Sequence, residues 1–398
     1  MSYVTLLPQT VEELAGAFVD EGSGAVAGEG RDTAHAVREH LRAAPPLVVP
    51  AETERLSVRL AAVARGEAFL LQGGDSTGAA TGDLQARLGA DLRVLHQLGV
   101  VLMYASGLPV VKTAQVCGPY ARTHRLAEGG VPPDHALSAA AMNLFRGLSR
   151  GEAPTLDRVH GWNTEFARTA AGARHRGLVE RIGRGLRFMA AGGFTDHTAR
   201  TAEVYTARRM LTPGDERAMM RPHPDAARPG APTVSGSAHF LWLDARTARA
   251  DASYADLVRR ASNPVGLRIG PDTTPARAAG LVERFDPHAV PGRLTLTCAM
   301  GSRGVRDLLP PVVERVEATG RKVVWQCDPL HRDPAASEGA FDEVTGFVEV
   351  HRGLGTHPGG LRVETGGPRD SAAGTRLTAP RAVALGFHTA ELLGALGT

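Results

Sequence analysis

Cysteine is scarce in this chain of 398 residues, which excludes a disulfide framework or a zinc cluster. The three cysteines are Cys117, Cys298 and Cys327, none of them in a CxxC pair, and all lie within or beside apolar segments. An odd number of widely spaced cysteines predicts reduced thiols.

Lysine is scarcer still, since Lys112 and Lys322 are the only two, and the net charge of +3 comes from arginines interspersed with acidic residues. A nucleic-acid-binding face needs clustered basic residues, so this function class is excluded. No apolar run approaches the roughly 18 residues of a membrane span. The N-terminus also lacks a basic start followed by an apolar core, and we expect a cytoplasmic protein without membrane association.

What the sequence does contain is an alternation of short apolar segments and amphipathic patterns from residue 66 onward, which is typical of parallel strands joined by crossover helices. Eight such strands predict a closed (βα)8 TIM barrel in the α/β class. The predicted strands cover residues 68–73, 109–116, 201–205, 239–244, 265–269, 294–299, 322–327 and 361–365.

The chain length does not require a second large domain, because such barrels commonly exceed 250 residues as one unit. We expect residues 1–65 to form an N-terminal helical extension and residues 66–398 to form the barrel catalytic domain. A helix is predicted over about 52–65, and the Pro- and Gly-rich tract 221–236 is expected to be a loop.

Polar residues gather where predicted strands end, which is how a barrel of this kind presents its chemistry. The segment VVWQCDPLH ends at His331, LRVE ends at Glu364, and FLLQGGD precedes Ser76. With further matching words at 161–166 and 291–296, these segments resemble class II 3-deoxy-arabino-heptulosonate 7-phosphate (DAHP) synthases, in order over about 45–398. The resemblance implies an aldol-type condensation of phosphoenolpyruvate with erythrose 4-phosphate.

The resemblance also implies a divalent metal, held in that family by a Cys after GGD, a His after CDPM, a Glu in HVE and an Asp in a DPRLN-like word. The corresponding residues here are Ser76, His331, Glu364 and Gly374, so a thiolate and a carboxylate are missing. We therefore expect no bound cofactor. The alternative is a metal such as Mn or Co on His331 and Glu364, completed by a nearby carboxylate from the set Asp75, Asp328 and Asp370.

The phosphoenolpyruvate site implied by the resemblance has also changed. Four places where the family carries cations read Gln115, Ala245 followed by Arg246, Arg268 and Ala299. Each lost charge-assisted hydrogen bond is worth roughly 1.5–3 kcal/mol, so a trianion would bind more weakly. We expect Gln115, Arg246 and Arg268 to bind the substrate, together with the strand-end residues Trp242 and Asp328.

The candidate catalytic residues are His331 and Glu364 for acid–base chemistry, with Ser76 and Lys112 as further candidates. Ser76 would need a base such as His331 to act as a nucleophile. Lys112 could form a Schiff base, but it lies three residues from Gln115 and so faces the opposite side of the strand.

The leading hypothesis is a DAHP-synthase-like enzyme recruited to specialised natural-product biosynthesis. It would catalyse an aldol-type or intramolecular condensation on an anionic small molecule that contains a carbonyl group. Two alternatives stay open: a functional DAHP synthase with rearranged ligands, and a non-catalytic binding or regulatory paralogue. The expected partners are a small-molecule substrate and further copies of the chain, in a homodimer or higher oligomer.

Overall fold

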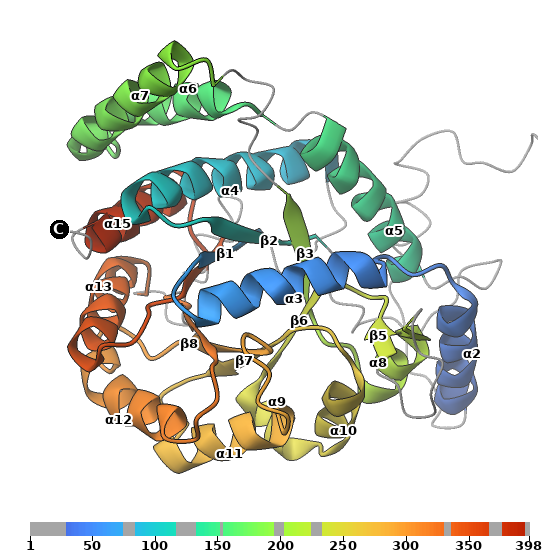
Figure 1. Cartoon of the computed structure of the whole chain (residues 1–398). Coiled ribbons are helices and arrows are strands. Elements are labelled where there is room, and N and C mark those ends of the chain that lie inside the picture. The colour runs from blue at the N-terminus through green and yellow to red at the C-terminus, as the bar shows by residue number, and fades with distance from the viewer. Residues whose placement is uncertain are drawn as a thin grey trace, which may run out of the picture.

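The computed structural model describes residues 29–74, 84–116, 133–151, 154–194, 203–223, 233–329, 336–365 and 376–394. Parallel strands form a closed barrel in the order β1-β10-β9-β8-β7-β6-β3-β2, with helices around it (Figure 1), which confirms the predicted TIM barrel. The barrel strands are β1 (Phe69–Gly74), β2 (Val110–Gln115), β3 (Val204–Arg209), β6 (Phe240–Asp244), β7 (Val265–Ile269), β8 (Leu294–Cys298), β9 (Val324–Cys327) and β10 (Gly360–Glu364).

The α-helices are α2 (Glu29–Ala43), α3 (Pro50–Ala64), α4 (Leu84–Ser106), α5 (Pro133–Arg146), α6 (Leu156–Ala167), α7 (Arg176–Ala191), α8 (Pro213–Met219), α9 (Ala245–Ala250), α10 (Ser253–Arg260), α11 (Pro275–Phe285), α12 (Val305–Glu317), α13 (Ala336–Leu354) and α15 (Ala379–Gly394). Two short helical turns, η2 (Gly147–Gly151) and η3 (Ala173–His175), flank α6. Within the described ranges, no helix is both long enough and apolar enough to cross a membrane.

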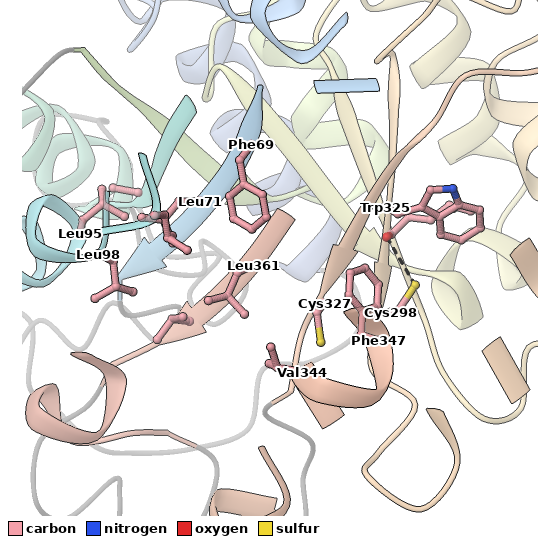
Figure 2. Close-up of a cluster of buried hydrophobic side chains, with 14 of the residues drawn as sticks. Phe69, Leu71, Leu95, Leu98, Cys298, Trp325, Cys327, Val344, Phe347 and Leu361 are labelled. Atoms are coloured by element: carbon pink, nitrogen blue, oxygen red, sulfur yellow. Dashed lines mark hydrogen bonds between the residues drawn. The ribbon is translucent and has the colours of Figure 1, made fainter. Parts of the chain in front are cut away.

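Alternation along the strands separates two apolar layers, because successive side chains point to opposite faces of the sheet. On β1, Phe69 and Leu71 belong to the outer layer, whereas Leu70 belongs to the cluster inside the barrel. Figure 2 shows the outer layer, in which Leu71 lies near Leu95 and Leu98 of α4. Its far end includes Phe347 of α13 and the side chains of Cys298 and Cys327, both of which are free thiols.

Helix α3 packs against the N-terminal end of the barrel, with Leu56, Leu60 and Val63 in the inner apolar cluster. Figure 1 shows α3 lying across the barrel, and its side chains in the inner cluster close this end. Gly292, in the turn before β8, allows the close approach: its φ is +71°, and a Cβ there would lie 2.3 Å from the carbonyl carbon of Leu60. The opposite end of the barrel carries the strand tips.

Two predictions about the chain between β2 and β6 need correction. The third barrel strand was expected at 201–205, but β3 extends over Val204–Arg209, because its terminal arginines are held in the sheet and pair with β6. The tract 221–236 was expected to be a loop, yet its ends form an antiparallel ladder of β4 (Met220–Pro222) and β5 (Thr233–Ser235). Arg221 stabilises this ladder by donating hydrogen bonds to carbonyl oxygens of Leu41 and Ala44.

Candidate functional site

Four charged side chains meet at the C-terminal mouth of the barrel, and we call them the mouth cluster: Arg268, Asp328, Arg362 and Glu364. Arg362 and Glu364 are two residues apart on β10 and therefore face the same side of the sheet. Asp328 directly follows β9, and Arg268 is the penultimate residue of β7. Three strands thus bring together residues that are nearly a hundred positions apart.

Asp328 is the centre of the mouth cluster. Its Oδ2 atom lies 3.2 Å from Nε of Arg268 and 3.3 Å from Nη1 of Arg362. Arg362 also donates a short hydrogen bond from Nη2 to Oε1 of Glu364. Two guanidinium groups therefore face two carboxylates, and the cluster as a whole is electrically neutral.

Burial makes this pairing necessary, because a buried charge is costly unless it is paired. The side chains of Asp328 and Arg362 are each 2% exposed, whereas Glu364 is 16% and Arg268 is 21% exposed. Asp328 raises the pKa of the Arg268 guanidinium above its usual value. Arg268 and Glu364 thus form the accessible part of the cluster, and Arg362 and Asp328 lie beneath them.

Trp242 on β6 supports the cluster from inside the barrel. Its ring lies 4.3 Å from Cζ of Arg362 and 5.9 Å from Cζ of Arg209, which are cation–π distances. Arg209 ends β3 and pairs with Asp244, at the end of β6, at 3.1 Å. Trp242 was predicted to bind substrate; the structure brings it to the mouth cluster.

Carboxamide groups line the barrel wall beside the cluster. Gln72 on β1, Gln115 on β2 and Gln326 on β9 share strand faces with inner-cluster residues and are buried. Each has an Nε2 atom without a hydrogen-bond partner among the described residues. Gln326 is oriented by Thr297, whose hydroxyl donates to its Oε1 at 2.9 Å. These groups are neutral N–H donors that the described residues leave unused.

Two predicted site residues lie apart from the mouth cluster. Lys112 faces α4, where a Cβ added at Gly99 would lie 3.2 Å from its Cδ, and burial lowers the pKa of its ammonium to about 8. A lysine on the outer face of β2 cannot form a Schiff base inside the barrel. Arg246 is on the exposed first turn of α9, where its Nε lies 2.9 Å from Oδ2 of Asp272. Ser76, His331 and Gly374, with Asp75 and Asp370, lie outside the described residues.

Two charged residues at the site, Arg362 and Glu343, were not predicted from the sequence. Glu343 on α13 is buried behind the mouth, and its Oε1 accepts a hydrogen bond of 2.7 Å from the N–H of Gly301 in the loop after β8. Burial raises the pKa of Glu343 to about 8, and the charge of Asp328 acts in the same direction. Arg362 is two residues before Glu364 on one strand, so alternation from Glu364 is the signal that could have found it. Glu343 is on a helix and carries no comparable signal.

The chain is similar in sequence to known proteins over most of its length. Residues 25–128 and 133–375 match the profile of the Class-II DAHP synthetase family. The chain is 40% identical to phospho-2-dehydro-3-deoxyheptonate aldolase AroG of Mycolicibacterium smegmatis, over 91% of this chain and 90% of the relative. It is 36% identical to the phospho-2-dehydro-3-deoxyheptonate aldolase of Streptomyces coelicolor, over 83% of this chain and 82% of that protein.

Proposed function

Because the chain belongs to the Class-II DAHP synthetase family, we propose that it joins phosphoenolpyruvate to erythrose 4-phosphate at the barrel mouth. In this reaction C3 of phosphoenolpyruvate bonds to the aldehyde carbon, and the aldehyde oxygen gains a proton. Water adds at C2 and inorganic phosphate leaves. The product is phospho-2-dehydro-3-deoxyheptonate, the compound named in both relatives.

The observation that carries the proposal is the 40% identity over 91% of the chain to a protein with this activity in its name. The alternative of a DAHP synthase with rearranged ligands therefore has more support than a changed substrate. The mouth cluster supplies matching chemistry, because Arg268 is accessible to a carboxylate or phosphate. Among the described residues of the mouth cluster, Glu364 is the partly accessible carboxylate that can exchange a proton with the reacting oxygen.

Neutral donors complete the substrate site in this proposal. The Nε2 atoms of Gln72, Gln115 and Gln326 can donate to oxygen atoms of a bound anion, in place of the cations that the sequence lacks. Such hydrogen bonds are weaker than those from a guanidinium. A working enzyme of this kind should therefore bind phosphoenolpyruvate weakly but catalyse the same reaction.

A second candidate is an aldol-type condensation on a less highly charged carbonyl compound, in a specialised biosynthetic pathway. Gln115 and Ala299, at places where the resemblance implies cations, favour it. The two candidates share the mouth cluster and differ in their substrates. A panel of aldehydes, with and without a phosphate group, separates them in one assay.

The test is consumption of phosphoenolpyruvate and release of phosphate when the purified protein is given erythrose 4-phosphate, with the product identified by mass spectrometry. Arg268→Ala should raise KM for phosphoenolpyruvate about tenfold or more, as expected for one charge-assisted hydrogen bond. Arg306→Ala is the matched control, since Arg306 pairs with Asp342 and Glu349 on the outer helices. Turnover only with another aldehyde would favour the second candidate. Binding without turnover of any aldehyde would favour a non-catalytic paralogue.

A further inference from the structure

The described side chains do not fit the divalent metal that the family resemblance implies. Of the four corresponding positions, only Glu364 lies within the described residues, and its Oε1 accepts a hydrogen bond from Arg362. No group of three or more His, Cys, Asp or Glu side chains in the described ranges could hold a metal ion. A metal ion at Glu364 would be repelled by positive charge, because a guanidinium already contacts the carboxylate that would bind the metal.

Arg362 is fixed in this place by several contacts. Its side chain is 2% exposed, its guanidinium bridges Asp328 and Glu364, and its Cζ lies 4.3 Å from the ring of Trp242. Arginine keeps its proton in proteins, so this positive charge is present at every working pH. In the family word HVE the first residue is His, and in this chain it is Arg362.

We propose that Arg362 is a built-in cation that takes the place of a divalent metal at Glu364. The proposal rests on the barrel-mouth site of the proposed function, but it concerns cation binding and can be measured without turnover. A divalent ion on Glu364 would displace the guanidinium. The buried Arg362 and the partly exposed Arg268 would then lie beside a doubly charged ion, with Asp328 as the remaining carboxylate of the cluster.

The arginine also has a hydrogen-bond donor to offer. Its Nε atom is buried and has no partner among the described residues, although both terminal nitrogens contact carboxylates. An N–H held in a fixed position can donate to the oxygen of a substrate carbonyl and stabilise negative charge on it during attack.

The experiment is a titration with Mn²⁺ alone, followed by electron paramagnetic resonance of the free ion, on purified wild-type protein and two variants. Arg362→Met keeps an unbranched side chain against Trp242 and removes the charge that occupies Glu364. Arg209→Met is the matched control, because Arg209 also faces Trp242 but pairs with Asp244. We expect weak Mn²⁺ binding in the wild type and in Arg209→Met. Arg362→Met should bind Mn²⁺ more tightly by about tenfold or more, because changing the group that contacts a metal ligand typically alters metal affinity by about this factor.

The proposal is overturned if the wild type binds one Mn²⁺ tightly, or if folded Arg362→Met binds no better than Arg209→Met. Glu364→Gln keeps the test decisive if Arg362→Met fails to fold. Its Mn²⁺ affinity should equal that of the wild type, and a loss of tenfold or more would identify Glu364 as a metal ligand. An inactive protein with this Mn²⁺ behaviour would refute the proposed reaction and leave the role of Arg362 standing.

Discussion

Replacing Asp328 by Asn should destabilise the protein strongly, because this one carboxylate separates two guanidinium groups. Its Oδ2 is 3.2 Å from Arg268 and 3.3 Å from Arg362, and its side chain is 2% exposed. Removing one partner of a buried ion pair costs about 3–5 kcal/mol, since it leaves uncompensated charge. Arg268 is partly exposed and Arg362 retains Glu364, so we expect the lower end, about 3 kcal/mol.

Asp272→Asn is the matched control for this prediction. Asp272 also pairs with an arginine, Arg246, at 2.9 Å, but the two side chains are 42% and 75% exposed. An exposed pair contributes at most about 1 kcal/mol. The assay is urea unfolding of both variants and the wild type, followed by tryptophan fluorescence and circular dichroism. Equal losses of unfolding free energy in the two variants, or a loss below about 1 kcal/mol for Asp328→Asn, would refute the reasoning.

Three further predictions concern a glutamate behind the mouth cluster, a buried histidine on α13 and a glycine at the opposite end of the barrel. Burial raises the pKa of Glu343 from 4.5 to about 8, so its stabilising contribution is full below pH 4.5 and is lost as pH rises toward 8. The unfolding free energy of Glu343→Gln, measured with urea, should therefore rise relative to that of the wild type by more than about 1 kcal/mol between pH 5 and pH 8. Burial lowers the pKa of His351 to about 3, so its contribution is full above pH 6.5 and is lost as pH falls toward 3. The unfolding free energy of His351→Gln should accordingly fall less steeply than that of the wild type as the pH is lowered. If the two proteins lose stability equally with acid, His351 is not a buried neutral imidazole. Gly292→Ala should lower the midpoint of thermal unfolding by its contact with Leu60, whereas Gly280→Ala, with open space around it, should not. Equal midpoints for the two glycine variants would contradict the close approach of α3.

Most of the barrel could be predicted from the sequence, because the strands are short continuous apolar runs that alternate with amphipathic helical patterns. The exception is β3, whose C-terminal half contains Arg208 and Arg209 and therefore looks like a loop. Arg208 is buried on one face of the strand, and Arg209 reaches the barrel mouth on the other. Long-range pairing with β6 keeps both in the sheet, and a local pattern does not contain that information.

The candidate site was predictable only in part. Arg268, Asp328 and Glu364 meet because strand tips of a barrel converge, which sequence position alone implies. Arg362 was missed because an arginine inside a strand has no evident partner until the neighbouring strand is placed. Strand alternation correctly predicted that Lys112 faces the opposite side of β2 from Gln115. The roles of Ser76 and His331 stay predictions, since both lie outside the described residues.

The central claim is that this barrel performs the condensation named in its relatives, and turnover tests it most directly. Purified protein should consume phosphoenolpyruvate only when erythrose 4-phosphate is present, releasing one phosphate for each phospho-2-dehydro-3-deoxyheptonate formed. A rate on the order of one per second or faster at saturation lies within the ordinary enzyme range. Folded protein that leaves both substrates unchanged at millimolar concentrations would contradict the account.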